Sequence, residues 1–349
     1  MTLKMRLFLA ILTLTEFTGC KPTEHLPIET RIESTGVEPL AAALSLFANG
    51  LEGYVFAAQG STLVRLNDGG RNIEPLAHFD DPIVGIYTTP TAQLLVSTDP
   101  NYWDSKFPCR VFISRDGAKT FELTKVIHGG CPLWWSFAAS ADGTLFMGEY
   151  GPKIGTLSKT VWRSRDNGRT WQAVFHAPLN DNAHVHRVTV DPYTGNVWVT
   201  IGDGSKNRGI YCSTDGGDTW SKMIESQATA VVFTEQGIYW GEDRAEGIIG
   251  FTLRSNNTTH TVLQISDRGH YGGSVYDLAL GRSGRIYAPF MKYPDQDHIA
   301  TLWSGLGKTW KLLLRLASRP GEGVNIPTIA GPDRDGWLYI GGYRIRDGS

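Results

Sequence analysis

The clearest chemical signal in the sequence is a pair of histidines two residues apart, His184 and His186. Residues at this spacing on a β-strand share one face, so both imidazole rings are expected to point the same way. Because histidine titrates near neutral pH, the pair could act as a general base, hold a metal ion or clamp a substrate. The alternative is that one or both are hydrogen-bonded packing residues in a polar channel.

Two other segments place histidine or aromatic side chains where a strand is expected to begin. His270 and Tyr271 precede two glycines, which would either let a ligand approach the backbone or only tighten the entry to the strand. Trp134 and Trp135 are adjacent and should therefore face opposite sides of a strand. We expect one of them to pack between structural units and the other to stack on a sugar ring.

Four carboxylates, Glu149, Asp203, Glu242 and Asp243, lie at the ends of predicted strands. A glycoside hydrolase needs two carboxyl groups, about 5 to 5.5 Å apart for retention or about 6.5 to 9.5 Å apart for inversion. A β-eliminating lyase instead needs a cation that neutralises a uronate carboxylate, a base for the α-proton and an acid for the leaving oxygen. The histidines, tyrosines and arginines could supply that set. Each carboxylate could equally be a solvated charge or half of a salt bridge.

The elements that position these residues are indicated by a repeated octet with the pattern Ser-x-Asp-x-Gly-x-Thr-Trp. It reads as a hairpin turn, in which the aspartate accepts backbone N–H bonds, the glycine adopts the left-handed conformation and the aromatic residue returns to the core. Three clear copies, one with Ala118 in the glycine place, and three weaker ones occupy residues 114–121, 164–171, 213–220, 66–73, 255–262 and 303–310.

The spacing of the octets predicts the fold. The aspartate-equivalent positions 68, 116, 166, 215, 257 and 305 are separated by 48, 50, 49, 42 and 48 residues, roughly the length of a four-stranded propeller blade. A second turn, of the form Asp-x-Gly or a relative of it, recurs seven times out of phase with the octets. We predict an all-β propeller with seven four-stranded blades, six being the alternative, closed by an N-terminal outer strand at residues 26–33. The fourth repeat should have strands near 184–190, 196–202, 208–213 and 219–224.

Both kinds of turn fall at one end of such a ring, so the opposite end carries the starts of the inner strands and the variable loops. Variable loops on a rigid scaffold are where binding and catalysis usually occur. The predicted catalytic residues are His184, His186, His270, Tyr271 and Glu149. The predicted substrate contacts are Tyr150, Asp203, Arg208, Glu242, Arg244, Trp103 and Trp135.

The octets resemble the Asp boxes, or BNR repeats, of the sialidase superfamily, which also occur in other secreted glycosidases, lyases and non-catalytic propellers. The resemblance covers most of the chain after its N-terminal segment and implies a β-propeller whose octets lie on the face away from the active site. Sialidases carry a Phe/Tyr-Arg-Ile-Pro motif near their start. Its nearest counterpart is Tyr343-Arg344-Ile345-Arg346, at the other end and without the proline, so a typical sialidase is not expected.

The first twenty residues have the features of a targeting segment. Lys4 and Arg6 precede an apolar run that leads to small residues and Cys20. This arrangement resembles the lipobox of bacterial lipoproteins, in which Cys20 would carry the lipid; an ordinary cleaved signal peptide or a short anchor is the alternative. We assign residues 1–20 to the signal and 21–349 to a single propeller domain, extracytoplasmic and either lipid-anchored to a bacterial membrane or secreted.

An extracytoplasmic location permits disulfides. Cys109 and Cys131 are expected to pair because both fall at the same end of neighbouring strands, and Cys212, in mid-strand, is expected to be a buried thiol. The net charge of −2 gives no reason to expect nucleic acid as a partner. We expect a monomer that contacts a membrane only through an N-terminal lipid and has no cofactor, with a divalent cation left open.

Two classes of function follow from these features. The first is an extracytoplasmic carbohydrate-active enzyme that degrades a polysaccharide or oligosaccharide, by β-elimination at a uronate or by glycoside hydrolysis. The second is a non-catalytic propeller that binds a glycan or a protein. An exposed apolar patch would favour a protein-binding propeller.

Overall fold

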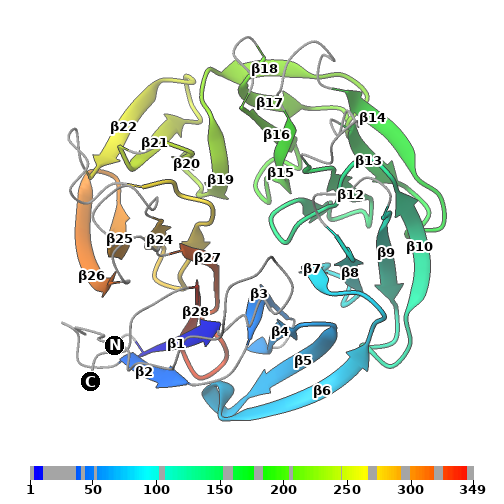
Figure 1. Ribbon diagram of the computed structural model, residues 1–349. Helices are drawn as coiled ribbons and strands as arrows, with labels where there is room; N and C mark the ends of the chain where they lie inside the picture. Colours follow the sequence, from blue (N-terminus) through cyan, green and yellow to red (C-terminus); the bar gives the residue numbers. More distant parts are fainter. Residues whose placement is uncertain are drawn as a thin grey trace, which may run out of the picture.

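The computed structural model describes residues 4–10, 37–40, 44–50, 53–101, 107–151, 160–176, 184–203, 207–244, 246–265, 273–291, 299–317 and 325–343. These residues fold into four-stranded β-sheets arranged as blades in a ring (Figure 1). The prediction of an all-β propeller is confirmed. No helix in the described part of the chain is long and apolar enough to cross a membrane.

Six of the sheets are antiparallel meanders of strands that follow one another in the chain. The first three blades contain β3 (Ser45–Asn49), β4 (Val55–Gln59), β5 (Thr62–Asn67) and β6 (Asn72–His78); β7 (Ile83–Thr88), β8 (Leu94–Thr98), β9 (Cys109–Ser114) and β10 (Glu122–Ile127); and β11 (Phe137–Ala139), β12 (Leu145–Gly148), β13 (Thr160–Ser164) and β14 (Gln172–His176). The next three contain β15 (His184–Val190), β16 (Val197–Gly202), β17 (Gly209–Ser213) and β18 (Ser221–Ile224); β19 (Ala228–Phe233), β20 (Gly237–Glu242), β21 (Ile248–Leu253) and β22 (Thr259–Gln264); and β23 (Ala279–Leu280), β24 (Ile286–Phe290), β25 (Ile299–Leu306) and β26 (Thr309–Ala317).

The seventh four-stranded sheet is assembled from both ends of the chain, in the order β2-β1-β28-β27. Its antiparallel pair β27 (Asn325–Ala330) and β28 (Trp337–Tyr343) is extended by β1 (Lys4–Ala10) and β2 (Val37–Leu40), and β1 runs parallel to β28. The ring therefore has six regular blades and one composite blade closed by N-terminal strands. The segment predicted for this closure, residues 26–33, lies outside the described residues. The place beside β28 is taken by β1, which falls within the predicted signal segment.

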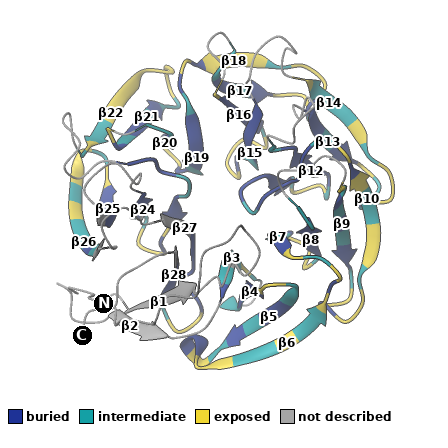
Figure 2. Cartoon of the chain, in the orientation of Figure 1, coloured by how far each residue is buried: buried dark blue, intermediate teal, exposed yellow. Residues whose placement is uncertain are grey.

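The core lies between neighbouring blades. The second strand of a regular blade is buried on both faces; all six residues of β16 and of β20 are buried, whereas the outer strand β6 alternates between exposed and half-buried positions. Figure 2 shows the same contrast between the inner and outer strands around the ring. One apolar cluster joins Trp198 and Ile210 of one blade to Phe233 and Trp240 of the next. Burial of both strand faces thus links each blade to its neighbours.

The fourth blade has the strands predicted for the fourth repeat, within two residues at each end. Its pairing places the starts of β15 and β17 and the end of β16 at one edge of the sheet, since His184 pairs with Gly202 and Ile201 pairs with Gly209. The octets occupy the other edge. We call the edge with the octets the turn face and the opposite edge the loop face.

Each clear octet is held by its aspartate. In residues 164–171, Asp166 Oδ1 accepts hydrogen bonds from Ser164 Oγ at 2.8 Å and from the Thr170 backbone N–H at 2.8 Å, and Oδ2 accepts one from Thr170 Oγ1 at 2.6 Å. Gly168 has φ +81° and donates its N–H to Ser164 Oγ. The same bonds recur around Asp116 and Asp215. The aspartates therefore have a structural role on the turn face.

Replacing Asp116 by asparagine is expected to lower the melting temperature by a few degrees at neutral pH. Hydrogen bonds, that of Thr120 foremost, lower the pKa of Asp116 to about 2. The carboxylate therefore stabilises the fold above its unfolded pKa of about 4, and this contribution is lost as the pH falls toward 2. Asp68→Asn is the matched control, because the Asp68 side chain is 71% exposed. Thermal unfolding at several pH values checks the prediction; equal losses in both variants would contradict it.

Candidate functional site

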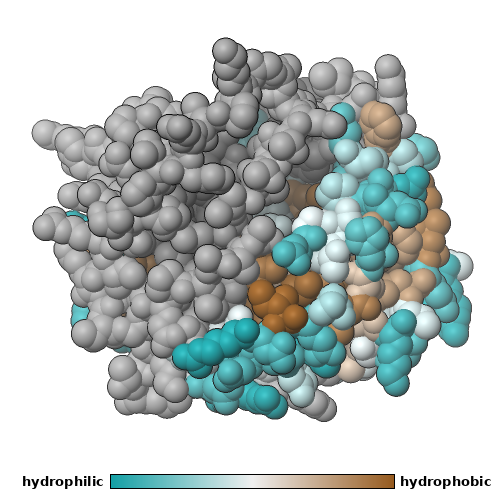
Figure 3. Space-filling model, turned by 60° about the horizontal axis from the view of Figure 1, so that its bottom comes forward, coloured by the Kyte–Doolittle hydropathy of each residue, from teal (hydrophilic) through white to brown (hydrophobic). Residues whose placement is uncertain are grey.

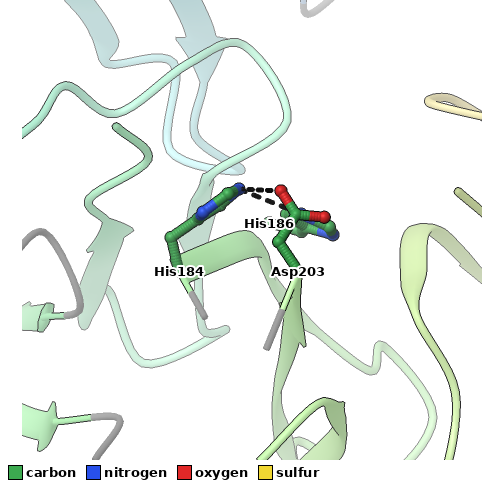
Figure 4. A group of neighbouring side chains, drawn as sticks. All are labelled: His184, His186 and Asp203. Carbon is green, nitrogen blue, oxygen red and sulfur yellow. Dashed lines mark hydrogen bonds and ion pairs between the residues drawn. The ribbon is translucent and has the colours of Figure 1, made fainter. Parts of the chain in front are cut away.

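His184 and His186 lie together at the loop face, at the start of β15. The two Nε2 atoms are 3.2 Å apart, and Figure 4 shows both side chains next to Asp203. The pairing of β15 with β16 shifts register between Val185 and Arg187, so His186 is the extra residue of a β-bulge. Bulges re-aim side chains and are common near active sites. The bulge and the alternation of the strand together bring the two rings to one point.

Asp203 completes the group from the end of β16. One of its carboxylate oxygens is 3.2 Å from His184 Nε2 and the other is 3.9 Å from His186 Nε2. Gln227, at the start of the next blade, donates a hydrogen bond from Nε2 to Asp203 Oδ1 at 2.9 Å. Burial raises the pKa of Asp203, His186 lowers it, and the Asp243 carboxylate raises it further. The pKa of Asp203 therefore depends on groups from two blades.

The hydrogen bonding of His186 defines its tautomer. Its Nδ1 is 3.0 Å from the backbone carbonyl of Ala228, and a carbonyl oxygen can only accept, so Nδ1 carries the hydrogen. In the neutral ring, Nε2 then presents a lone pair toward His184 and Asp203. The side chain of His186 is 1% exposed and that of His184 is 11% exposed, whereas Asp203 is 39% exposed. The two histidines are therefore largely buried, and the Asp203 carboxylate is the part of the group that contacts solvent.

Aromatic residues surround the histidines. The ring of Tyr150 lies edge-on to His184, with centroids 4.4 Å apart, and 5.8 Å from His186. Trp135 packs against Tyr150 at 5.4 Å and against Tyr276 of the sixth blade region at 5.4 Å. We call His184, His186, Asp203, Tyr150 and Trp135 the histidine cluster. It combines basic, acidic and phenolic groups with an aromatic wall.

The expected arrangement of the two adjacent tryptophans is wrong in one respect. Trp134 and Trp135 lie in a turn before β11, not on a strand, and their ring centroids are 4.3 Å apart. The two side chains nevertheless pack against different parts of the molecule, as expected. Trp134 packs against the apolar cluster that contains Phe79 and Ile83, and Trp135 packs against Tyr150 in the histidine cluster.

A further acidic pair borders the cluster at the end of β20. Asp243 accepts a short hydrogen bond from Ser274 Oγ and one from the Tyr276 hydroxyl at 3.1 Å. Glu242 accepts a hydrogen bond from Ser226 Oγ at 2.8 Å and forms an ion pair with Arg244 at 3.3 Å. Both carboxylates are thus already engaged by neighbouring protein groups.

Two predicted site residues are oriented elsewhere. Glu149 accepts a hydrogen bond from Trp162 Nε1 at 2.6 Å, within the third blade. Burial raises its pKa, and Trp162 and Lys125 lower it. Arg208, directly before β17, interacts electrostatically with Glu225, whose pKa is lowered mainly by its hydrogen bond with Lys222 and to a smaller extent by Arg208. Neither side chain has a described contact with the histidine cluster. Both residues follow or precede strands at the loop face, but their side chains interact with other groups, Glu149 with Trp162 of β13 and Arg208 with Glu225 after β18.

Four other predicted residues, Trp103, His270, Tyr271 and the lipidation candidate Cys20, lie outside the described residues. Sequence reasoning also missed the contributions of Gln227 and Tyr276. Gln227 directly precedes an inner strand, as His184 opens one, and that common position is the signal that could have identified it.

A disulfide lies next to the histidine cluster and holds the backbone of Tyr150. Cys109 and Cys131, the pair expected from the sequence, are joined with a Cα–Cα distance of 5.4 Å. Cys131 also exchanges both backbone hydrogen bonds with Tyr150, at 3.0 and 3.2 Å. The covalent link between the second and third blades thus fixes the backbone of Tyr150. Cys212 is buried, and burial raises its pKa to about 12.

Comparison with known proteins supports the β-propeller fold and does not identify an activity. A family model described as "Sortilin, neurotensin receptor 3" matches residues 109–268, which is less than half of the chain. No curated protein matches the sequence.

Solved structures of similar fold include a GH74 enzyme from Niastella koreensis, with a TM-score of 0.57, 14% sequence identity, and coverage of 87% of this chain and 55% of that one. Another is the extracellular domain of a putative hybrid two component system, BT4673, from B. thetaiotaomicron, with a TM-score of 0.58, 14% identity, and coverage of 87% and 37%. The chain therefore spans about half or less of these two proteins. At this identity the likeness shows a shared β-propeller fold.

Proposed function

We propose that the chain is an extracytoplasmic carbohydrate-active enzyme that cleaves an acidic polysaccharide or oligosaccharide at the histidine cluster. The observation that carries this proposal is the convergence of His184, His186 and Asp203 beside the rings of Tyr150 and Trp135. Titratable groups that meet at the variable end of a rigid scaffold are typical of active sites. An aromatic wall beside them suits the apolar face of a sugar ring.

β-Elimination at a uronate fits these groups best. The two histidines lie where positive charge, on protonated imidazoles or on a bound cation, can neutralise the uronate carboxylate. Tyr150 is the neighbouring group that can transfer a proton. Its phenolate would take the proton from C5, the C5–H electron pair would form the C4–C5 double bond, and the C4–O bond would break. The leaving oxygen would then receive the proton from the tyrosine hydroxyl, so that the enzyme returns to its starting state.

Hydrolysis by two carboxylates is the second candidate. It is favoured by the electrostatic interaction between Asp203 and Asp243, which come from neighbouring blades. It is disfavoured by the bonds that already engage Asp243, Glu242 and Glu149. Elimination by Tyr150 and the histidines does not require a pair of carboxylates at the reacting centre.

A propeller that binds a protein partner has less support. The large hydrophobic side chains exposed among the described residues are divided among three blades that are not neighbours: Phe107, Leu123 and Val126 in the second, Tyr193 and Met223 in the fourth, and Leu280 and Leu306 in the sixth. Figure 3 shows hydrophilic and hydrophobic residues intermixed on the described part of one side of the molecule. A protein-binding surface would more often gather such residues into one patch.

The test is incubation of the full chain with a panel of uronate-containing and neutral glycans, followed by mass spectrometry of the products. Elimination yields an unsaturated product without added water and an absorbance near about 235 nm, whereas hydrolysis adds one water for each bond cleaved. We expect the unsaturated product. Binding without cleavage across the panel would establish the non-catalytic alternative instead.

A further inference from the structure

We propose that Nε2 of His184, Nε2 of His186 and a carboxylate oxygen of Asp203 bind one divalent transition-metal ion of the zinc class. All three ligand atoms lie within 4.8 Å of one another. Two histidines and one carboxylate form a ligand set used by metals that keep further coordination positions open. The inference names a cofactor for the proposed active site and rests on the proposed function only for the role of that cofactor in cleavage.

The distances between the ligand atoms match a metal site. The His184 Nε2 to His186 Nε2 distance is 3.2 Å, and the nearer Asp203 oxygen is 3.2 Å from His184 Nε2. Ligands held about 2.0 to 2.2 Å from a tetrahedral zinc ion are about 3.3 to 3.6 Å apart. His186 Nε2 is 3.9 Å from the other Asp203 oxygen, so a rotation of the exposed Asp203 side chain is needed to bring one oxygen to both histidines.

The groups around these ligands orient them for a metal. The backbone carbonyl of Ala228 accepts the Nδ1 hydrogen of His186, which leaves Nε2 free of hydrogen in the neutral ring. Metal-bound histidines nearly always make such a bond with their other ring nitrogen. Gln227 holds the Asp203 carboxylate in the same way. These bonds come from the next blade, so the site is preorganised by the packing of two blades.

The backbone also makes room for this arrangement. A Cβ atom on Gly202 would overlap the His186 ring. Only glycine at this position lets the ring lie against β16 with its Nε2 toward Asp203.

An open coordination position would face the aromatic wall. Asp203 is the exposed member of the set, and Tyr150 lies edge-on to His184. A uronate carboxylate could therefore bind the metal with its sugar ring near Tyr150 and Trp135. The ion would supply the positive charge that elimination requires.

Calorimetric titration of the chelator-treated full chain with Zn²⁺ tests the inference without any glycan. We expect one equivalent to bind. His186→Ala and Asp203→Asn should each weaken binding at least about 100-fold, and Gln227→Ala about 10- to 100-fold, as is usual for groups that orient a ligand. His78→Ala, at an exposed histidine in the first blade, is the control and should bind as the wild type does. Circular dichroism spectra establish that each variant is folded, and Asp203→Asn keeps the size of a side chain that is 39% exposed.

The inference is overturned if the wild type binds no Zn²⁺ or if Asp203→Asn and Gln227→Ala bind as the wild type does. The proposed function fails separately. Zn²⁺ binding without cleavage of any glycan would leave the metal site standing and remove the enzyme. Cleavage that is undiminished in the chelator-treated protein would leave the enzyme standing and remove the role of the metal in cleavage.

Discussion

A Gly202→Ala variant is expected to lose Zn²⁺ binding and glycan cleavage by about 100-fold or more while it retains the propeller fold. The added methyl group would overlap Cε1 and both nitrogens of the His186 ring. The ring is 1% exposed and is held by the Ala228 carbonyl, so it must leave its position to relieve the overlap. A displacement of about 1 Å at a reacting group can cost about 10² in rate.

The control lies in the same hairpin. Gly195 connects β15 to β16 at the turn face, and a Cβ atom there would meet no atom within 4 Å. Because Gly195 has φ +73°, Gly195→Ala should cost about 1 kcal/mol of stability and leave the histidine cluster intact. Calorimetry, product analysis and thermal unfolding of both variants distinguish these effects. Wild-type metal affinity in Gly202→Ala would contradict the geometry described for His186.

Replacing Tyr150 by phenylalanine is expected to lower kcat/KM by about 10²- to 10⁴-fold. The variant keeps the ring that packs edge-on against His184 and against Trp135 and removes only the hydroxyl group assigned to proton transfer. Zn²⁺ affinity should therefore change by no more than a few-fold. The separation of a large loss of turnover from retained metal binding is the signature of a group that acts on substrate.

Tyr193→Phe provides the matched control. Tyr193 is 51% exposed in the turn that follows β15 in the fourth blade, at the end of the strand opposite the cluster, and its replacement should leave turnover unchanged. Steady-state kinetics on the glycan that the wild type cleaves best makes the comparison. A Tyr150→Phe variant with turnover within tenfold of the wild type would remove this residue from the chemistry.

The repeat period predicted most of the fold. Each octet forms the same turn, and that turn needs an aspartate in a fixed place. Asp116, Asp166 and Asp215 accept the same hydrogen bonds in their octets, which explains why the motif repeats along the sequence. The composite blade was harder to predict. In this blade β1 pairs with β28 and β2 pairs with β1, and no octet or glycine turn joins these strands, so the sequence offers no repeat spacing that would predict the pairing.

The candidate site was only partly predictable. The spacing of His184 and His186 indicated a shared face, but their contact also depends on a bulge whose register is set by β16. Glu149 shows the limit of assigning side chains by strand end, because Trp162 on the neighbouring strand draws it away from the loop face. Tertiary partners from other blades, such as Gln227, decide which loop carboxylate joins the histidines.

Hydrogen–deuterium exchange with and without the tightest-binding glycan of the panel tests most directly the claim that the histidine cluster is the functional site. Backbone amides that slow their exchange report the surface that a ligand covers or orders. We expect protection in residues 131–136, 148–150, 184–187 and 201–203, at the loop face, and none in the octets at 114–121, 164–171 and 213–220. Protection of the octets with unchanged exchange around His184 and His186 would contradict the account.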